Sequence, residues 1–249
     1  MKILKILLIL LILFSFAVYG CGDDDEEEIA PTPTPTVVPS PTPIPTPPVE
    51  PSPTPIPNGI ELVRQYGVSD EVAVRWGGDT VLYRDKSNWL HLEEVLNEWR
   101  EVLYPMGVQL KEGGDFAPLS IEFSREMFTG GNWGAVGLCF LHHVDARIVR
   151  ARIVIREPGN YNIFGQTFPW FPTAEELYEV FSHELCHALG FWGHTDEGGL
   201  MDPYRNDSSE ITPTIRLMLS TLYSMEPGER LVEGATIPRE GFFVIDDQL

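Results

Sequence analysis

The chain has 249 residues and a formal net charge of −20. Residues 1–57 hold two lysines and seven acidic residues, which leaves fifteen basic and thirty acidic residues in the remainder. Nucleic acids and anionic lipid surfaces attract basic proteins, so the composition argues against a nucleic-acid-binding protein and against electrostatic docking on a membrane. Residues 58–249 suffice for one domain with a sizeable core, which we expect to be a monomer.

The N-terminus has the pattern of an export signal. Two lysines precede an apolar run over residues 6–18, which is too short to span a bilayer comfortably. The run ends in a Val-Tyr-Gly-Cys sequence at Cys21 that resembles the bacterial lipobox, where the cysteine carries lipid. We therefore expect a signal peptide over residues 1–20 and a lipoprotein anchored at the cell surface through Cys21. A plain cleaved signal peptide is the alternative.

Residues 21–57 have the composition of a linker. Six consecutive acidic residues, Asp23–Glu28, favour a solvated and disordered segment. Residues 31–57 contain 13 of the 22 prolines, mostly alternating with Thr, Ser, Val or Ile. Alternating proline removes backbone donors and favours an extended polyproline-like chain. The linker is therefore predicted to hold the domain 58–249 away from the membrane.

The first part of the domain alternates between strand and helix patterns. Apolar residues at helical spacing predict a helix over Ser87–Tyr104, capped by Ser87 or Asn88 and ended by Pro105 and Gly107. A loop is expected from the last strand of this part to Pro172. The expected strands are 72–76, 80–84 (the two flanking a Gly-Gly turn), 108–110, 119–123, 136–141 and 147–155.

Two further helices follow. Thr173 and Glu176 form a capping box at the start of a helix that runs to Leu189, and Gly190 suits its left-handed end. A last helix is expected over residues 212–225, and the tail 228–249 either adds strands near 241–245 or wraps the domain. The element order indicates the α+β class with a mixed sheet.

The helix that ends at Leu189 contains a metal-binding pattern. His183 and His187 lie four residues apart, so both imidazoles share one helical face and can reach one ion. Glu184 lies beside them, in the place of a general base for a metal-activated water. Imidazole ligands suit zinc, and a catalytic site leaves one coordination position open.

The segment His183–Gly190, followed by His194 and by the sequence Gly-Leu-Met-Asp-Pro around Met201, resembles the metzincin zinc peptidases, closest to their matrixin-like branch. The resemblance implies a twisted mixed sheet with a backing helix, an active-site helix and a C-terminal helix. It implies a catalytic zinc held by three histidines. It also implies that Met201 is the methionine of a Met-turn beneath the zinc ligands.

The third ligand departs from the family spacing. The family places this histidine three residues after the glycine, at Gly193 here, whereas the chain has His194. A one-residue bulge over residues 191–193 would absorb the shift, because glycine tolerates unusual backbone angles. We expect His194 to be the third ligand, and Asp196 is the alternative, since some related peptidases use a carboxylate.

These features predict a zinc endopeptidase that cleaves internal peptide bonds of extracellular proteins, with Glu184 as general base. The resemblance implies that an extended substrate pairs with an edge strand, for which residues 132–141 are the candidate. The alternative from another class is a non-catalytic surface-binding lipoprotein on a metzincin scaffold. Loss of Glu184 or of a ligand would favour that alternative, yet all of them are present.

Two weaker sets of residues remain. His142, His143 and Asp145 are candidates for a second, structural zinc or calcium ion, although a polar loop between strands explains them as well. Cys139 and Cys186 form an even pair in an exported protein, so they form either a disulfide between a strand and the zinc helix or two buried thiols.

Overall fold

The structure is a computed structural model that describes residues 58–128, 134–202 and 209–248. The predicted signal peptide 1–20, the lipidation site Cys21 and the rest of the linker lie outside the described residues. Within the described part of the chain, no helix has both the length and the apolar character needed to cross a membrane.

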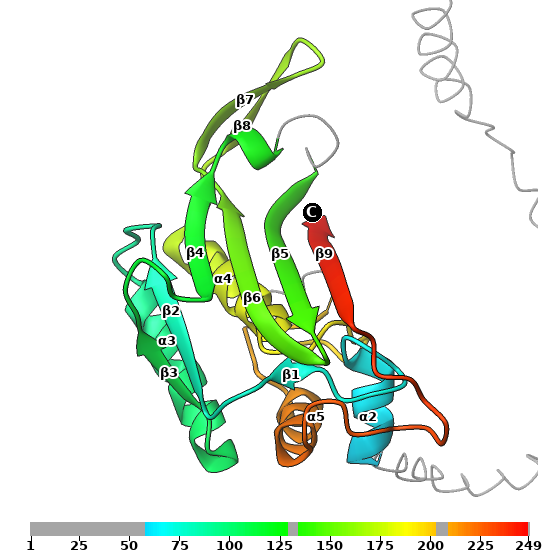
Figure 1. The fold of residues 1–249 in the computed structure, drawn as a ribbon. Helices are drawn as coiled ribbons and strands as arrows, with labels where there is room; N and C mark the ends of the chain where they lie inside the picture. Colours follow the sequence, from blue (N-terminus) through cyan, green and yellow to red (C-terminus); the bar gives the residue numbers. More distant parts are fainter. Residues whose placement is uncertain (1–57, 129–133, 203–208, 249) are drawn as a thin grey trace, which may run out of the picture. The chain divides into compact units, whose positions relative to one another are not determined.

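One mixed sheet organises the domain (Figure 1). Its first four strands are parallel, whereas β5 and β9 each run antiparallel to the neighbour that precedes them in the sheet. The short strand β1 (Arg75–Trp76) pairs with the start of β6. The spatial order is β3 (Gln109–Glu112), β2 (Thr80–Asp85), β4 (Leu119–Ser124), β6 (Arg147–Arg156), β5 (Ala135–Val144) and β9 (Glu240–Gln248).

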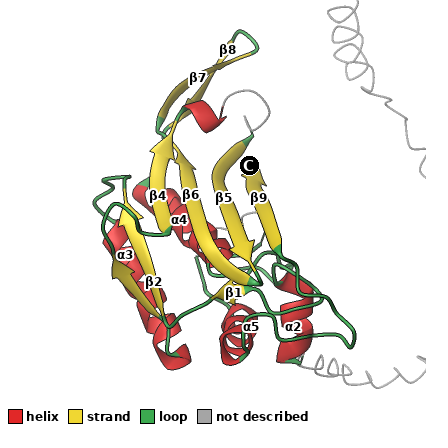
Figure 2. Cartoon of the chain, in the orientation of Figure 1, coloured by secondary structure: helices red, strands yellow, loops and turns green. Residues whose placement is uncertain are grey.

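Helices cover one face of this sheet (Figure 2). Helix α4 (Ala174–Ala188) packs against β5 and β6, and α3 (Leu92–Leu103) packs beside it near β3. Helices α5 (Pro213–Ser224) and α2 (Gly59–Tyr66) pack against each other near β1. The domain therefore belongs to the α+β class with a mixed twisted sheet, as the sequence predicts.

The helix expected over Ser87–Tyr104 begins later, at Leu92, with His91 at the N-cap. Ser87 and Asn88 are not its caps. The backbone N–H and hydroxyl of Ser87 both donate to Asp85 Oδ1, at 2.7 Å, and Asn88 has a left-handed φ of +54°. A left-handed residue cannot continue a right-handed helical path, so the helix starts after it.

The end of that helix is as predicted. A short 3₁₀ turn, η1 (Tyr104–Met106), contains Pro105 and stops at Gly107, whose φ is +74°.

A β-hairpin replaces the loop expected before Pro172. It consists of β7 (Gly159–Ile163) and β8 (Gln166–Trp170) and projects past the end of the main sheet (Figure 1). Tyr161 and Ile163 are buried in a second apolar cluster. The prediction of a loop was wrong because it followed the Asn, Gly and Pro content of the segment. The alternation of buried and exposed residues along β7 is the strand pattern that this composition hid.

The first two expected strands differ from the prediction in length and in pairing. Within the segment 72–76, only β1 is a strand, and it pairs with β6. β2 pairs with β3 and β4, so the Gly77-Gly78 turn does not close a hairpin.

The tail contains a strand that changes the sheet edge. β9 pairs along the outer side of β5, from Glu240 opposite Val144 to Gln248 opposite Ala135. Strand formation near residues 241–245 agrees with the first of the two expectations for the tail. The candidate substrate edge at 132–141 was wrong in one respect, because in its described part β5 is an interior strand with β9 on its outer side.

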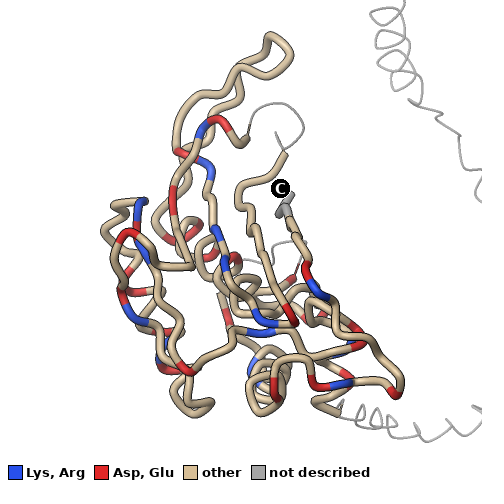
Figure 3. The backbone as a smooth tube through the Cα atoms, viewed as in Figure 1, with Lys and Arg blue, Asp and Glu red and all other residues tan. Residues whose placement is uncertain are grey.

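Arg152 of β6 forms an ion pair with Glu122 of the neighbouring strand β4. Figure 3 shows Lys and Arg spaced along β6 among acidic residues of neighbouring segments. Arg152 Nε lies 2.5 Å from Glu122 Oε1, and Lys86 Nζ lies 3.6 Å from the other oxygen of the same carboxylate.

Candidate metal site

The N-terminal half of α4 is fixed by two sets of hydrogen bonds. The Glu176 N–H donates to Thr173 Oγ1 (3.1 Å) and the Thr173 N–H donates to Glu176 Oε2 (2.6 Å), which confirms the capping box. In the middle of the helix, the indole N–H of Trp99 in α3 donates to Ser182 Oγ (2.8 Å), and both groups are buried. The helix is therefore held in register one residue before His183.

The C-terminal end of α4 is also held by side chains. The Trp76 indole donates to the carbonyl of Ala188 (2.8 Å), and the Tyr223 hydroxyl donates to that of Leu189 (3.0 Å). Gly190 follows with a φ of +106°, and a Cβ there would lie 2.9 Å from Leu222 Cδ2. The chain can therefore turn sharply away from the helix end only with glycine at this position.

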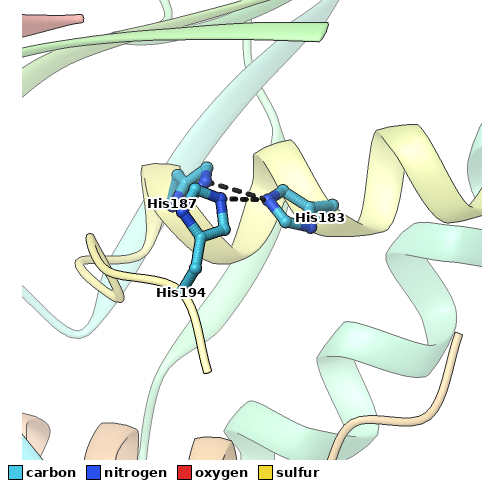
Figure 4. Close-up of side chains that lie close together, drawn as sticks. All are labelled: His183, His187 and His194. Atoms are coloured by element: carbon cyan, nitrogen blue, oxygen red, sulfur yellow. Dashed lines mark hydrogen bonds between the residues drawn. The ribbon is translucent and has the colours of Figure 1, made fainter. Parts of the chain in front are cut away.

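Three imidazoles converge beyond this turn (Figure 4). His183 Nε2 lies 3.0 Å from His187 Nε2 and 3.2 Å from His194 Nε2. His183 and His187 are buried, and His194 is partly buried. Their ligand atoms lie within 4.8 Å of one another, so they can bind one metal ion together. It is the only such group of three or more among the described residues.

Hydrogen bonds from the Nδ1 atoms of two of these rings show which ring nitrogen carries a proton. His183 Nδ1 lies 2.6 Å from the carbonyl oxygen of Leu200, and His187 Nδ1 lies 2.8 Å from that of Phe191. A carbonyl only accepts hydrogen bonds, so each Nδ1 carries the proton and each neutral ring presents the lone pair of Nε2. The Nε2 atoms of these two rings lie 3.0 Å apart and are the nitrogens that can bind a metal ion.

The segment before His194 contacts the C-terminal end of α2. The backbone N–H groups of Trp192 and Gly193 both donate to the carbonyl of Tyr66, at 2.5 and 3.0 Å. These contacts fix the path of residues 191–193 between the end of α4 and His194. Gly193 has no positive φ, contrary to the expected use of glycine's permissive backbone. Its missing side chain is used instead, since a Cβ would lie 3.0 Å from Tyr66 Cδ1.

The alternative ligand is placed away from the other two histidines. Asp196 is exposed and is not part of the three-residue cluster. Its charge raises the pKa of Tyr66, after the larger effect of burial on that hydroxyl. The geometry therefore brings His194, and not Asp196, to His183 and His187.

Met201 is fully buried in the main core. Its carbonyl accepts from the N–H of Thr195 (2.8 Å), the residue that follows His194. Leu200, the preceding residue, supplies the carbonyl that orients His183. The segment around Met201 is thus tied to two of the three imidazoles, and Pro203 of the same motif lies outside the described residues.

Glu184 is fully buried and lies against Gly137 of β5. A Cβ at Gly137 would lie 2.1 Å from Glu184 Oε1 and 2.8 Å from its Cγ, so only glycine leaves room for this carboxylate. Gly137 lies within the expected strand 136–141, and the sequence did not predict this contact. A glycine within a strand pattern often marks a close approach, which is the signal that identifies it.

The second candidate metal site is not formed. His142 and His143 are neighbours on β5, and successive strand residues point to opposite faces. His142 Nε2 lies 2.9 Å from Glu240 Oε1, whereas the His143 ring stacks on Phe243. Asp145 follows in the turn with a φ of +46°.

The two described cysteines are not bridged. Cys139 and Cys186 are both buried thiols, which leaves the second of the two expectations. Cys186 is not part of the three-histidine group, and burial raises the pKa of its thiol well above the ordinary value.

No model of a known protein family matches the chain, and a search of curated proteins finds no significant relative.

Proposed function

We propose that the domain is a zinc-dependent endopeptidase with a metzincin-like site. The observation that carries this proposal is the convergence of three imidazole Nε2 atoms, two of them from the helix that also carries the buried Glu184. The backing helix α3, the helix α4 and the C-terminal helix α5 are the elements that the resemblance implies, and they support the same conclusion.

The donor set fits zinc. Three nitrogens at about 2.0–2.1 Å from one tetrahedral ion would lie about 3.3–3.4 Å apart, close to the separations of 3.0 and 3.2 Å from His183 Nε2. Each of two ligands also donates its Nδ1 proton to a backbone carbonyl, as ligating histidines usually do. Three neutral ligands leave one position for water or substrate, which is typical of catalytic zinc.

The chain's own residues suit peptide hydrolysis. Bound zinc would polarise the scissile carbonyl and lower the pKa of the attacking water. Glu184 would take a proton from that water as its oxygen attacks the carbonyl carbon. It would then give a proton to the leaving amine nitrogen as the C–N bond breaks. The packing of Glu184 against Gly137 holds the carboxylate in place for both transfers.

The experiment measures cleavage of casein and gelatin by the zinc-loaded protein and by two charge-matched variants. Glu184→Gln should retain zinc and lose activity by at least about 100-fold, because a general acid–base group contributes about 10²–10⁴-fold. Glu175→Gln changes an exposed residue on the same helix and should leave activity unchanged.

A zinc-loaded protein in which Glu184→Gln cleaves as fast as the wild type would contradict the proposed role of Glu184. Full zinc binding without cleavage by any form would favour the alternative of a non-catalytic binding protein on the cell surface.

A further inference from the structure

The outer edge of β5 is occupied by the chain itself. β9 pairs antiparallel with β5 over its whole length, with one register irregularity at Ala135/Gly137. The backbone N–H and C=O groups on this side of β5 are the ones that an added peptide strand would use. Two strands cannot pair with one edge at the same time, so β9 and an extended substrate exclude each other there.

β9 also runs beside the metal site. Residue 247 lies opposite Gly137, which packs on Glu184. Nearer the start of β9, Phe243 is partly buried, and its ring centroid lies 5.6 Å from that of Trp192. The Trp192 ring in turn lies 5.8 Å from His187. The strand therefore passes the site from the side of His187 to the side of Glu184.

The attachment of β9 is one-sided. Its only partner strand among the described residues is β5. Phe242 and Val244, on the face away from α4, remain 72% and 56% exposed. An edge strand whose apolar side chains on one face stay largely exposed gains little free energy from burial on that face. Backbone hydrogen bonds to β5 and side-chain packing on the inner face therefore stabilise β9.

A buried imidazole weakens the pairing further. His143 is 2% exposed, and its Nδ1 is buried without a hydrogen-bond partner in the structure. An unsatisfied buried polar group costs about 1–3 kcal/mol. β9 crosses this ring at Gly241, where a Cβ would lie 2.4 Å from His143 Nε2. Gly241 therefore lets β9 pass close to the His143 ring, and β9 buries a ring nitrogen that would otherwise be hydrated.

We propose that β9 is a resident pseudosubstrate strand, which fills the peptide-binding edge of β5 and must leave before a protein substrate can pair there. This proposal rests on the proposed peptidase function. Under this proposal, β9 and the substrate compete for the edge of β5, so the release of β9 sets the fraction of molecules with an open edge.

The test is an engineered disulfide that joins β9 to β5 and can be reduced, here called the β5–β9 lock. Residues directly opposite across antiparallel strands have Cβ atoms about 4.5–5.5 Å apart, close to the span of a disulfide. The pair Phe140→Cys and Val244→Cys joins β5 to β9 on the face away from α4. The matched control, Phe140→Cys with Arg152→Cys, joins β5 to β6 on its other side, where no movement is proposed.

The oxidised β5–β9 lock should cleave casein at least tenfold more slowly than the same protein after reduction, whereas the control pair should show no such difference. Equal rates for the oxidised and reduced lock would overturn the proposal. Absence of cleavage by both forms would instead contradict the peptidase function, and a binding measurement then decides the question for β9.

The binding measurement uses a fluorescent peptide with the sequence of residues 240–248. The locked protein carries the Glu184→Gln substitution, which prevents hydrolysis of the peptide. The reduced lock should bind this peptide at least tenfold more tightly than the oxidised lock, because only the reduced form can release its own strand. Equal binding by the two forms, or binding by neither, would overturn the proposal without reference to activity.

Discussion

At the scale of single residues, the site depends on a contact between a glycine and a carboxylate. Gly137→Ala would place a Cβ about where Glu184 Oε1 now lies, so the carboxylate must move. We expect zinc binding to be retained and activity to fall about 100-fold, the usual consequence of a misplaced catalytic group. Gly114→Ala is the control, since no atom lies within 4 Å of a Cβ there. Normal activity of Gly137→Ala would contradict this role.

The cysteine between the two ligands provides another residue-scale prediction. Because burial raises the pKa of the Cys186 thiol, little thiolate forms in the folded protein at neutral pH. Iodoacetamide should therefore leave Cys186 unmodified in the native protein and should alkylate it after unfolding in guanidinium, as measured by mass spectrometry of peptides. Rapid alkylation of the native protein would show that this face of α4 opens.

The sequence identifies His183, His187 and His194 as a possible metal-binding group because their spacing follows the helix and the turn after it. It could not identify Gly137 as the partner of Glu184. That contact joins two elements distant in sequence, and glycine has no side chain whose chemistry would point to it.

At the scale of elements, α4 depends on α3 for its position. Ser182→Ala would leave the indole N–H of Trp99 buried without its acceptor, and such a loss costs about 1–3 kcal/mol. Urea denaturation should show this decrease in the free energy of unfolding. Ser220→Ala, on the exposed side of α5, should change it by less than about 0.5 kcal/mol. Similar values for the two variants would contradict the role of the Trp99–Ser182 hydrogen bond.

β9 should respond to pH through His143. Burial lowers the pKa of this imidazole, and the charge of His142 lowers it further, whereas Glu240 raises it. The paired state thus binds protons less readily than the open state, so pairing is favoured above about pH 6.5 and weakens as the pH falls below it. Amide exchange of β9 should accelerate on acidification in the wild type, and His143→Phe should remove most of that acceleration. An unchanged pH dependence in this variant would exclude His143 as the cause.

Elements with strong local signals are predictable from the sequence, and elements defined by pairing are less so. The capping box and Gly190 fix α4, and Thr212-Pro213 begins α5 as expected. The start of α3 and the hairpin of β7 and β8 were missed, because Asn88 turns left-handed and the hairpin's loop-forming residues mask its alternation.

At the scale of the whole molecule, the order of strands in the sheet determines what the site can bind. The sequence predicts an α+β domain with a mixed sheet, yet periodicity within one segment carries no information about its partner. For this reason the substrate edge was assigned to β5 without β9, which comes from the end of the chain and pairs across about a hundred residues of sequence.

The central claim is that His183, His187 and His194 hold one zinc ion. Its most direct test is the zinc content per chain of the wild type, His194→Ala and Asp196→Ala after dialysis against a weak chelator. We predict one zinc per chain in the wild type and in Asp196→Ala, and loss of zinc in His194→Ala. Retention of zinc by His194→Ala together with its loss from Asp196→Ala would contradict the claim.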